Sequence, residues 1–451
     1  MHVSSKPVSE MRIVGSLALL YVFRMLGLFM VFPVMMLYGR DYIDQTPFLL
    51  GAALGIYGLT QAVFQIPLGL LSDVWGRKPV IFMGLIVFAI GSLVAANADT
   101  VWGLLIGRAL QGSGAIASAI LALVGDLTSE QNRTRAMAVI GGSIGLSFAI
   151  AMIIGPMLAA KGGLASIFWL ASALAGIGIV VLWRAVPNPP AHSLRGAEGI
   201  AVPALFSRAL KNPHLLKLNF AIFVLHFVLT TTFVAAPLVL EASGKASANH
   251  WQYYLPVMLL AFVAMVPLMY VAERKRKAKG VMQFSIVLML ASLVALALGS
   301  KVTAIWLAGI FVFFTAFNLL EATLPSWLSK QAPAGSKGTA MGIYSTCQFL
   351  GASAGGFLGG YIAQHLGVTE VFWLGVIATT VWLGISFFML APPPLKSLCL
   401  PCKNAVSGPE LMTEVAGVVE CAWVAEQQLL YLKVGDGFEQ QQLDQYLHSK
   451  I

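Results

Sequence analysis

The chain has 451 residues, of which 58% are hydrophobic and only 10% are charged. Soluble domains are about 45–50% apolar and about 25% charged, so the composition excludes a water-soluble globular protein. Residues 1–399 hold 25 Lys/Arg and 12 Asp/Glu, for +13, while residues 400–451 hold 3 and 7, for −4. A basic membrane body with an acidic tail offers no soluble basic face, which argues against nucleic acid as a partner.

Twelve apolar segments follow one another, each near the roughly 20 residues that a spanning helix needs. Their expected limits are 12–38, 48–70, 79–97, 101–125, 136–160, 166–186, 214–240, 252–272, 281–299, 302–328, 339–364 and 368–391. Backbone polar groups must be satisfied inside lipid, so each span is expected to be helical. The polar first ten residues do not form a cleavable signal peptide, so the first span is expected to be retained. The predicted fold class is an all-α membrane protein.

The distribution of Lys and Arg predicts the orientation. With the N-terminus in the cytosol, 22 of the 28 basic residues fall in cytosolic segments. The outer loops then hold Arg40, Lys161, Lys245 and Lys301. The sequence therefore predicts a multi-pass protein of the cell inner (plasma) membrane, with the N- and C-termini cytosolic.

A polar linker divides the spans into six plus six. It starts with PNPP at 187–190, and its residues 203–211 are expected to form a short surface helix. The predicted domains are 1–186 (six-helix bundle), 187–213 (linker), 214–395 (six-helix bundle) and 396–451 (cytosolic tail).

The two bundles also repeat each other at an offset of 204 residues. RAMA at 135–138 corresponds to TAMG at 339–342, Gly155 to Gly359 and Pro33 to Pro237. Many secondary transporters are built from duplicated halves around a central site.

The tail is expected to be a separate α+β unit. Strands are predicted at 397–402, 418–424 and 429–434, and helices at 409–416 and 438–448. This β-α-β-β-α order indicates a small ferredoxin-like domain whose last strand is missing or very short.

The loop between the second and third spans has the sequence GLLSDVWGRKP at 69–79. Gly69 permits close approach to a neighbouring helix, Gly76 permits a tight turn, and Pro79 suits a first helical turn.

Four charged residues are predicted to gate the cytosolic side: Asp73, Arg77 and Lys78 of this loop, and Asp126 outside it. Asp73 is expected to face the partly positive N-terminus of the eleventh span. Arg77 is expected to bridge Asp73 to Asp126 at the inner end of the fourth span. With Lys78, this cluster would latch the cytosolic side shut in one state. An ordinary basic inner loop is the alternative for Arg77 and Lys78 taken alone.

The loop resembles the signature G-x-L-x-D-x-x-G-R-K/R of the major facilitator superfamily. RALQGSGA at 108–115 is similar to its R-x-x-Q-G-x-G-A segment, and Gly155-Pro156 matches its antiporter pattern, g-x-x-x-G-P-x-x-G-G. Three glycine positions of that pattern are alanine here, although small residues still permit packing and a kink. The alanines leave symport open.

The resemblance covers essentially the whole chain, in particular to the drug:proton antiporter branch with a small cytosolic tail. It implies two six-helix bundles that rock about a midplane cavity, and export driven by proton entry. It implies no enzyme activity and no cofactor. The expected partners are a small-molecule substrate, protons and the lipid bilayer, and a monomer is expected.

A proton-driven transporter needs a titrating group in its cavity. Glu321 is the one carboxylate well inside a predicted span, and Asn318 shares its helical face. Glu321 is therefore the predicted proton carrier, with a permanently paired structural acid as the alternative. His226 is either a second titrating group, a substrate contact or an interhelical hydrogen bonder.

Two arginines also lie inside predicted spans. Arg24 is either the counter-charge of Glu321 or an anchor for an anionic substrate. Arg108 is expected to face the cavity or a partner because embedded charge is costly, or else to bond backbone carbonyls.

Further polar residues recur at helical spacing on two spans. They are Tyr57, Gln61 and Gln65 on the second span, and Tyr344 and Gln348 on the eleventh. They would line the cavity or hold helices together, and both interpretations stay open.

The tail carries a C-x-x-C spacing at Cys399 and Cys402. Residues three apart on a strand face opposite sides, so no metal site is predicted. The acidic tail is expected to dock against the basic loop 273–279. The leading functional prediction is proton-driven export of small amphipathic or drug-like molecules. The alternatives are a proton-coupled uptake symporter for a small polar nutrient, and a membrane sensor with a ligand-binding tail.

Overall fold

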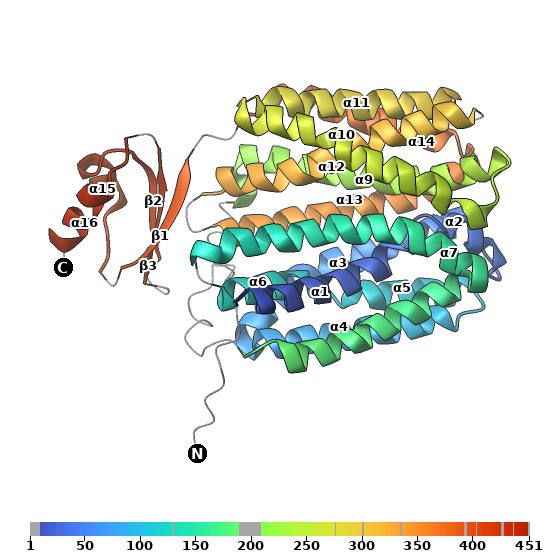
Figure 1. Ribbon diagram of the computed structural model, residues 1–451, viewed down its shortest axis with the longest axis horizontal. Helices are drawn as coiled ribbons and strands as arrows, with labels where there is room; N and C mark the ends of the chain where they lie inside the picture. The colour runs from blue at the N-terminus through green and yellow to red at the C-terminus, as the bar shows by residue number, and fades with distance from the viewer. Residues whose placement is uncertain are drawn as a thin grey trace, which may run out of the picture.

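The computed structural model describes residues 10–128, 130–188, 209–275, 277–299, 302–333, 336–391, 395–402, 404–424, 428–435 and 437–449. Two groups of long helices lie side by side, and a small sheet with its own helices lies beyond one end (Figure 1). The end of the bundle that carries Arg40 is called the Arg40 end, and the opposite end is called the tail end.

The first half of the chain forms the blue to green helices of Figure 1. They are α1 (Glu10–Phe29), α2 (Met35–Tyr38), the 3₁₀ turn η1 (Gly39–Asp41), α3 (Pro47–Trp75), α4 (Arg77–Ala96), α5 (Val101–Ser113), α6 (Ala117–Leu127) and α7 (Glu130–Ala185).

The second half forms the yellow-green to orange helices. They are α9 (Pro213–Ala242), the 3₁₀ turn η3 (Ser247–Asn249), α10 (Trp251–Arg274), α11 (Ala278–Gly299), α12 (Thr303–Gln331), α13 (Lys337–His365) and α14 (Glu370–Ser386). The predicted surface helix at 203–211 falls mainly on residues 189–208, outside the described residues.

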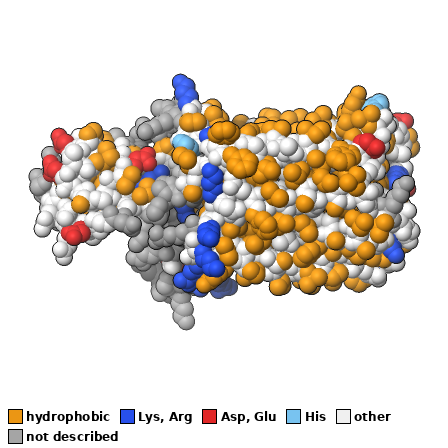
Figure 2. Space-filling model, turned by 90° about the horizontal axis from the view of Figure 1, so that it is seen from above, with side chains coloured by type: hydrophobic (Ala, Val, Ile, Leu, Met, Phe, Trp, Pro, Cys, Tyr) orange, Lys and Arg blue, Asp and Glu red, His pale blue; other side chains and the backbone are white. Residues whose placement is uncertain are grey.

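Much of the helical body is apolar on its outside, as lipid requires. Nine helical segments of the described residues are long and apolar enough to cross a membrane, and α14 is a shorter apolar helix. Figure 2 shows hydrophobic side chains over the body and Lys and Arg gathered next to the tail. Val263 and Ile106, for example, are 69% and 58% exposed, which a water-facing surface would not favour.

Two predicted spans are interrupted in the structure. The first, predicted as 12–38, ends as α1 at Phe29 and resumes as the short α2. Pro33 lies in the gap and has no N–H for a helical hydrogen bond. The fourth, predicted as 101–125, breaks between α5 and α6. A Cβ on Gly114 would lie 2.4 Å from the carbonyl oxygen of Gly84. The backbone at the break is therefore packed directly against α4.

The long α7 contains the predicted fifth and sixth spans. The backbone leaves helical geometry at Gly162 and Gly163, and Gly163 has a φ of +60°. Glycine adopts this left-handed conformation without steric cost, so the two spans reverse direction over two residues.

The structure shows the 204-residue repeat as a repeated helix contact. A Cβ on Gly155 of α7 would lie 2.5 Å from the carbonyl oxygen of Met30, just after α1. A Cβ on Gly359 of α13 would lie 3.3 Å from Val234 of α9. Gly155 and Gly359 are 204 residues apart, and so are Met30 and Val234. The contact between α1 and α7 is therefore equivalent to the contact between α9 and α13.

The two halves meet closely along α3 and α13. A Cβ on Gly51 would lie 2.5 Å from the carbonyl oxygen of Gly356, and one on Gly55 would lie 2.7 Å from that of Ser353. We call Gly51, Gly55, Ser353, Gly356 and Gly360 the glycine seam. Because α3 starts and α13 ends at the Arg40 end, the seam lies in that part of the bundle.

The C-terminal end of α14 fastens three neighbouring helices together. Lys217 of α9 donates to the carbonyl of Phe388 at 2.7 Å, and Lys279 of α11 donates to that of Phe387 at 2.9 Å. Gln331 of α12 donates to the carbonyl of Leu390 at 2.8 Å. These carbonyls have no helical partner of their own, so the side chains satisfy them.

The tail contains β1 (Lys396–Pro401), α15 (Gly408–Glu414), β2 (Val418–Val424), β3 (Leu429–Val434) and α16 (Gln440–Ser449). This is the predicted order of elements. The sheet is antiparallel with strand order β1-β3-β2. Its helices cover a small core of its own, which includes Leu411, Leu430, Leu432 and Leu443.

Candidate functional site

Three polar side chains from three helices meet inside the second half. Gln348 of α13 places its Nε2 2.8 Å from Nε2 of His226 on α9 and 3.2 Å from Oε1 of Glu321 on α12. His226 Nε2 is 3.8 Å from Glu321 Oε2. The Glu321 side chain is 31% exposed, while its Oε2 atom is buried. The structure thus brings together three of the predicted site residues.

Several buried polar atoms on α3, α12 and α13 have no hydrogen-bond partner within the described part of the chain. They are Asn318 Nδ2, Tyr344 OH, Tyr57 OH and Glu321 Oε2. Buried polar atoms are usually bonded. Asn318 precedes Glu321 by three residues on α12, and Tyr344 precedes Gln348 by four on α13, so these two side chains lie on the same helical faces as the cluster.

Arg24 heads a second polar chain in the first half. Its Nη2 donates to Oε1 of Gln61, and Gln61 Nε2 donates to Oε1 of Gln65 at 2.9 Å. Arg24 is only 2% exposed, and its Nε and Nη1 find no acceptor among the residues that the structure describes.

These contacts bear on the two roles expected for Arg24, which are counter-charge of Glu321 and anchor for an anionic substrate. Within the described residues, no ion pair joins Arg24 to Glu321, and the titratable side chain beside Glu321 is His226. In this conformation Arg24 therefore does not act as the direct counter-charge of Glu321.

Two of the three guanidinium nitrogens of Arg108 are bonded within the first half, and Nη2 has no partner among the described residues. Its Nε donates to the carbonyl of Ala53 at 3.1 Å, and its Nη1 to Gln111 at 2.8 Å. Its guanidinium lies 4.7 Å from the ring centre of Tyr57. Gln111 in turn donates to Ser92. This geometry matches the structural alternative, in which Arg108 joins α3 and α5.

An aromatic cluster lies next to the polar site, and the sequence analysis did not identify it. Phe148 of α7 contacts Phe29 of α1, Phe233 of α9 and Phe317 of α12, with ring centres 5.0, 6.1 and 6.3 Å away. Phe317 also lies 5.8 Å from the ring of His226. In apolar spans, periodicity does not distinguish these rings from lipid-facing ones.

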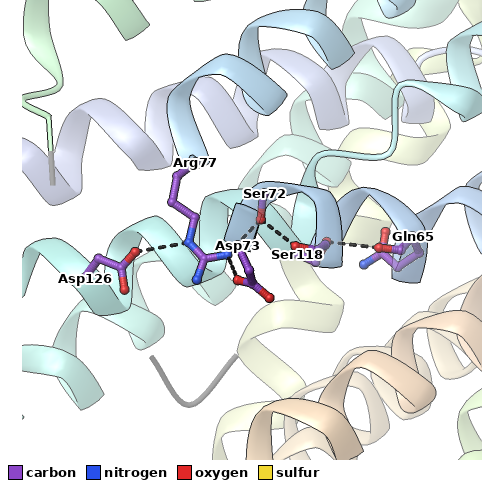
Figure 3. Close-up of polar contacts among 7 residues, drawn as sticks. Gln65, Ser72, Asp73, Arg77, Ser118 and Asp126 are labelled. Carbon is purple, nitrogen blue, oxygen red and sulfur yellow. Dashed lines mark hydrogen bonds and ion pairs between the residues drawn. The ribbon is translucent and has the colours of Figure 1, made fainter. Parts of the chain in front are cut away.

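The latch residues form a compact cluster at the tail end (Figure 3). Arg77 is 2% exposed and lies between Asp73 of α3 and Asp126 of α6. Its Nε donates to Asp126 at 3.1 Å, and its Nη1 donates to both Asp73 and Ser72. This is the bridge that the loop pattern predicts.

The predicted contact between Asp73 and the start of α13 is not made in this conformation. Asp73 Oδ1 accepts from Arg77, while Oδ2 has no hydrogen-bond partner in the described ranges. Lys78 points elsewhere, since its ammonium donates to the carbonyl of Val186 at 2.8 Å. The latch role itself stays a prediction.

The remaining predicted positions serve packing or belong to the tail. A Cβ on Gly69 would lie 3.1 Å from Ser118 Oγ, and Gly76 has a φ of +95°. Pro156 lies inside α7, next to Gly155.

None of the four cysteines forms a disulfide within the described residues. Cys402 donates to the carbonyl of Asn404, and Cys399 lies on β1 opposite Tyr431. No group of three or more metal-ligating side chains occurs among the described residues.

The tail contacts the helical body at α12. Lys433 of β3 donates to the carbonyl of Lys330 at 3.3 Å and pairs with Glu420 at 3.1 Å. Docking on the loop 273–279 is not tested, because Arg276 lies outside the described residues.

Comparisons with known proteins agree with this architecture. Residues 17–356 and 258–401 match the Major Facilitator Superfamily. The chain is 47% identical to the inner membrane transport protein YajR of Escherichia coli K12 over 94% of each chain. It is 30% identical to the class G tetracycline resistance protein of Vibrio anguillarum over 51% of this chain and 56% of that one.

A solved structure shows the same fold. The nucleoside transporter NupG superposes with a TM-score of 0.68 and 15% identity, over 84% of this chain and all of the other. The helical body, the family match and the YajR relative identify a membrane transporter of small molecules rather than an enzyme. The chain therefore belongs to the major facilitator superfamily.

Proposed function

We propose that the chain is a proton-coupled antiporter that exports small amphipathic, drug-like molecules across the inner membrane by alternating access. The observation that carries the proposal is the carboxylate of Glu321, held by Gln348 beside His226 inside the second half. An acid cannot bind a proton and a cationic group of a substrate at the same time. That competition is what exchange requires.

The proposed membrane arrangement has twelve spans. In it α5 and α6 form one span, α7 forms two, and α13 and α14 are the last two. The bundles are 1–186 and 214–395 with both termini cytosolic, and the tail is a ferredoxin-like domain without its fourth strand. The strand order β1-β3-β2 supports this domain type.

The proposed substrate class follows from the lining. Phe148, Phe233 and Phe317 offer aromatic rings beside the polar atoms of Glu321 and Asn318. Ligand sites typically combine an apolar lining with a few polar groups. The similarity to a tetracycline resistance protein supports a drug-like cargo.

Contacts between the halves support alternating access. They gather at the Arg40 end, where the glycine seam lies, Arg40 pairs with Glu241 at 2.7 Å, and the Phe48 N–H donates to Gln364 at 3.1 Å. Toward the tail end, a Cβ on Gly342 of α13 would meet no atom within 4 Å. We interpret this as a state closed at the Arg40 end, in which Arg77 and its carboxylates wait to engage α13.

Vesicle transport tests the proposal. The protein is reconstituted with an acid interior, and cationic and neutral drug-like compounds are screened for collapse of the pH gradient. Wild type should collapse the gradient, Glu321→Gln should not, and Glu370→Gln, which changes an exposed acid at the start of α14, should behave as wild type. Collapse that persists in Glu321→Gln would move the carrier elsewhere. No response to any compound would refute export and favour uptake or sensing.

A further inference from the structure

We propose that Gln348 is a positioning residue of the proton site, whose side-chain amide turns over when Glu321 takes up a proton. This inference rests on the proposed function, because it assigns the carrier role to Glu321. The amide joins α13 to the two helices that carry His226 and Glu321. Those two side chains are 3.8 Å apart, too far for a direct hydrogen bond.

The first orientation of the amide fits an ionised Glu321. The two N–H groups of Gln348 Nε2 then donate to Glu321 Oε1 and to His226 Nε2, at 3.2 and 2.8 Å. An imidazole nitrogen accepts only when it carries no proton, so His226 is neutral with its proton on Nδ1.

The second orientation fits a protonated Glu321. When the proton is taken up on Oε1, the oxygen that Gln348 contacts, that oxygen carries an O–H that must donate toward the amide. If the amide turns by 180°, Oε1 of Gln348 lies where Nε2 was and accepts from that O–H. The same oxygen accepts from His226 only if the imidazole carries its proton on Nε2.

If only one or two of the three groups (Glu321, the amide and the imidazole) changed, two donors or two acceptors would face each other. Three changes are therefore linked: one proton joins Glu321 from cavity water, the amide turns over, and His226 exchanges its Nδ1 proton for one on Nε2. The imidazole gains no net proton, so the step takes up one proton in all. Amide orientation is assigned from such networks, and this network has one self-consistent solution with Oε1 unprotonated and another with Oε1 protonated.

Other titratable groups face the site but do not join these three atoms. Tyr344 of α13 and Tyr21 of α1 interact electrostatically with Glu321, and Arg24 of α1 interacts with Tyr21. On α10, Tyr254 packs against Trp306, which precedes Glu321 by 15 residues, about 22 Å along α12. None of them substitutes for the amide between His226 and Glu321.

The first test is the pH profile of transport in vesicles. Gln348→Met keeps the length of the side chain and removes the amide. A hydrogen bond to an ionised acid is about twice as strong as one between neutral groups, so its loss disfavours the ionised form. The midpoint of the profile should move to higher pH by about one unit, a tenfold change in proton concentration. Thr346→Val, two residues away and bonded only to the carbonyl of Gly342 on its own helix, should keep the wild-type midpoint.

A second measurement does not depend on transport. Nitrogen-15 NMR of histidine-labelled protein in lipid, assigned with His226→Asn, should show the proton of His226 on Nδ1 at high pH and on Nε2 at low pH. In Gln348→Met this exchange should be lost.

The two hypotheses fail in different ways. If wild type never responds to any compound, the proposed function fails. If wild type responds, Glu321→Gln abolishes the response, and Gln348→Met titrates as wild type with an unchanged His226 tautomer, the inference about Gln348 is wrong.

Discussion

Adding one methyl group to the glycine seam should open the Arg40 end. In Gly356→Ala, the new Cβ would lie 2.6 Å from both the Gly51 carbonyl oxygen and the Gly55 amide nitrogen. Ordinary contact begins near 3.4 Å, so α3 and α13 must separate by roughly 0.8 Å. Both neighbours are backbone atoms, which cannot rotate out of the way as a side chain can.

The size of the effect follows from the cost of overpacking, about 1–3 kcal/mol. Only the state that is closed at the Arg40 end bears this cost, because the seam is separated in the other state. The ratio of the two states should therefore move about 5- to 150-fold toward opening at the Arg40 end.

Disulfide crosslinking measures this ratio. Cysteines placed at Phe48 and Gln364, which are joined by a hydrogen bond in the closed state, should crosslink in an otherwise cysteine-free protein. Gly356→Ala should slow the reaction by the same factor. Gly342→Ala is the matched control, because the same change on the same helix meets no atom within 4 Å. Equal crosslinking in the two variants would refute the link between the seam and the state of the transporter.

Three further predictions concern charged and reactive groups. Arg77→Met removes the cation that Asp126 contacts in a buried cluster, so thermal unfolding in detergent should show a loss of about 3 kcal/mol; an unchanged midpoint would contradict this. Arg40 and Glu241 are 48% and 34% exposed, so a double-mutant cycle on closure of the Arg40 end should give a coupling of only about 0.2–1 kcal/mol, lost at high salt. Burial raises the pKa of the Cys421 thiol, so in a variant with that single cysteine, iodoacetamide labelling should reach half its maximum above pH 8.5, the value for a free cysteine; half-labelling below that pH would show an exposed thiol.

The sequence predicted the Arg77 bridge because the loop at 69–79 carries an acid and two bases in a recognisable pattern, and Asp126 lies at the inner end of the fourth predicted span. It singled out Glu321, His226 and Gln348 because polar residues are rare in apolar spans. It did not predict that these three would share one network, since the rotation of each helix about its axis depends on packing across the bundle. For the same reason it left Arg24 beside Glu321 as an alternative, whereas Gln61 takes the Arg24 guanidinium.

The aromatic cluster and the glycine seam were missed for a related reason. A phenylalanine in an apolar span is equally compatible with lipid and with an interior contact, so Phe148 gave no signal. Gly51 and Gly356 are 305 residues apart, and only the folded chain shows that they lie against each other. Both features depend on contacts between halves, which local patterns do not encode.

The hydrogen bonds around the end of α14 also mark the boundary between the helical body and the tail. Every side chain that fastens α9, α11 and α12 there bonds a carbonyl at or before Leu390. The sheet beyond has its own core, and within the described ranges one hydrogen bond, from Lys433, returns to α12. A reading frame that stopped after Ala391 would keep all three helix-fastening bonds. This boundary is therefore the place to fuse a reporter domain or to exchange one tail for another. A replacement made there leaves the hydrogen bonds of the helical bundle unchanged.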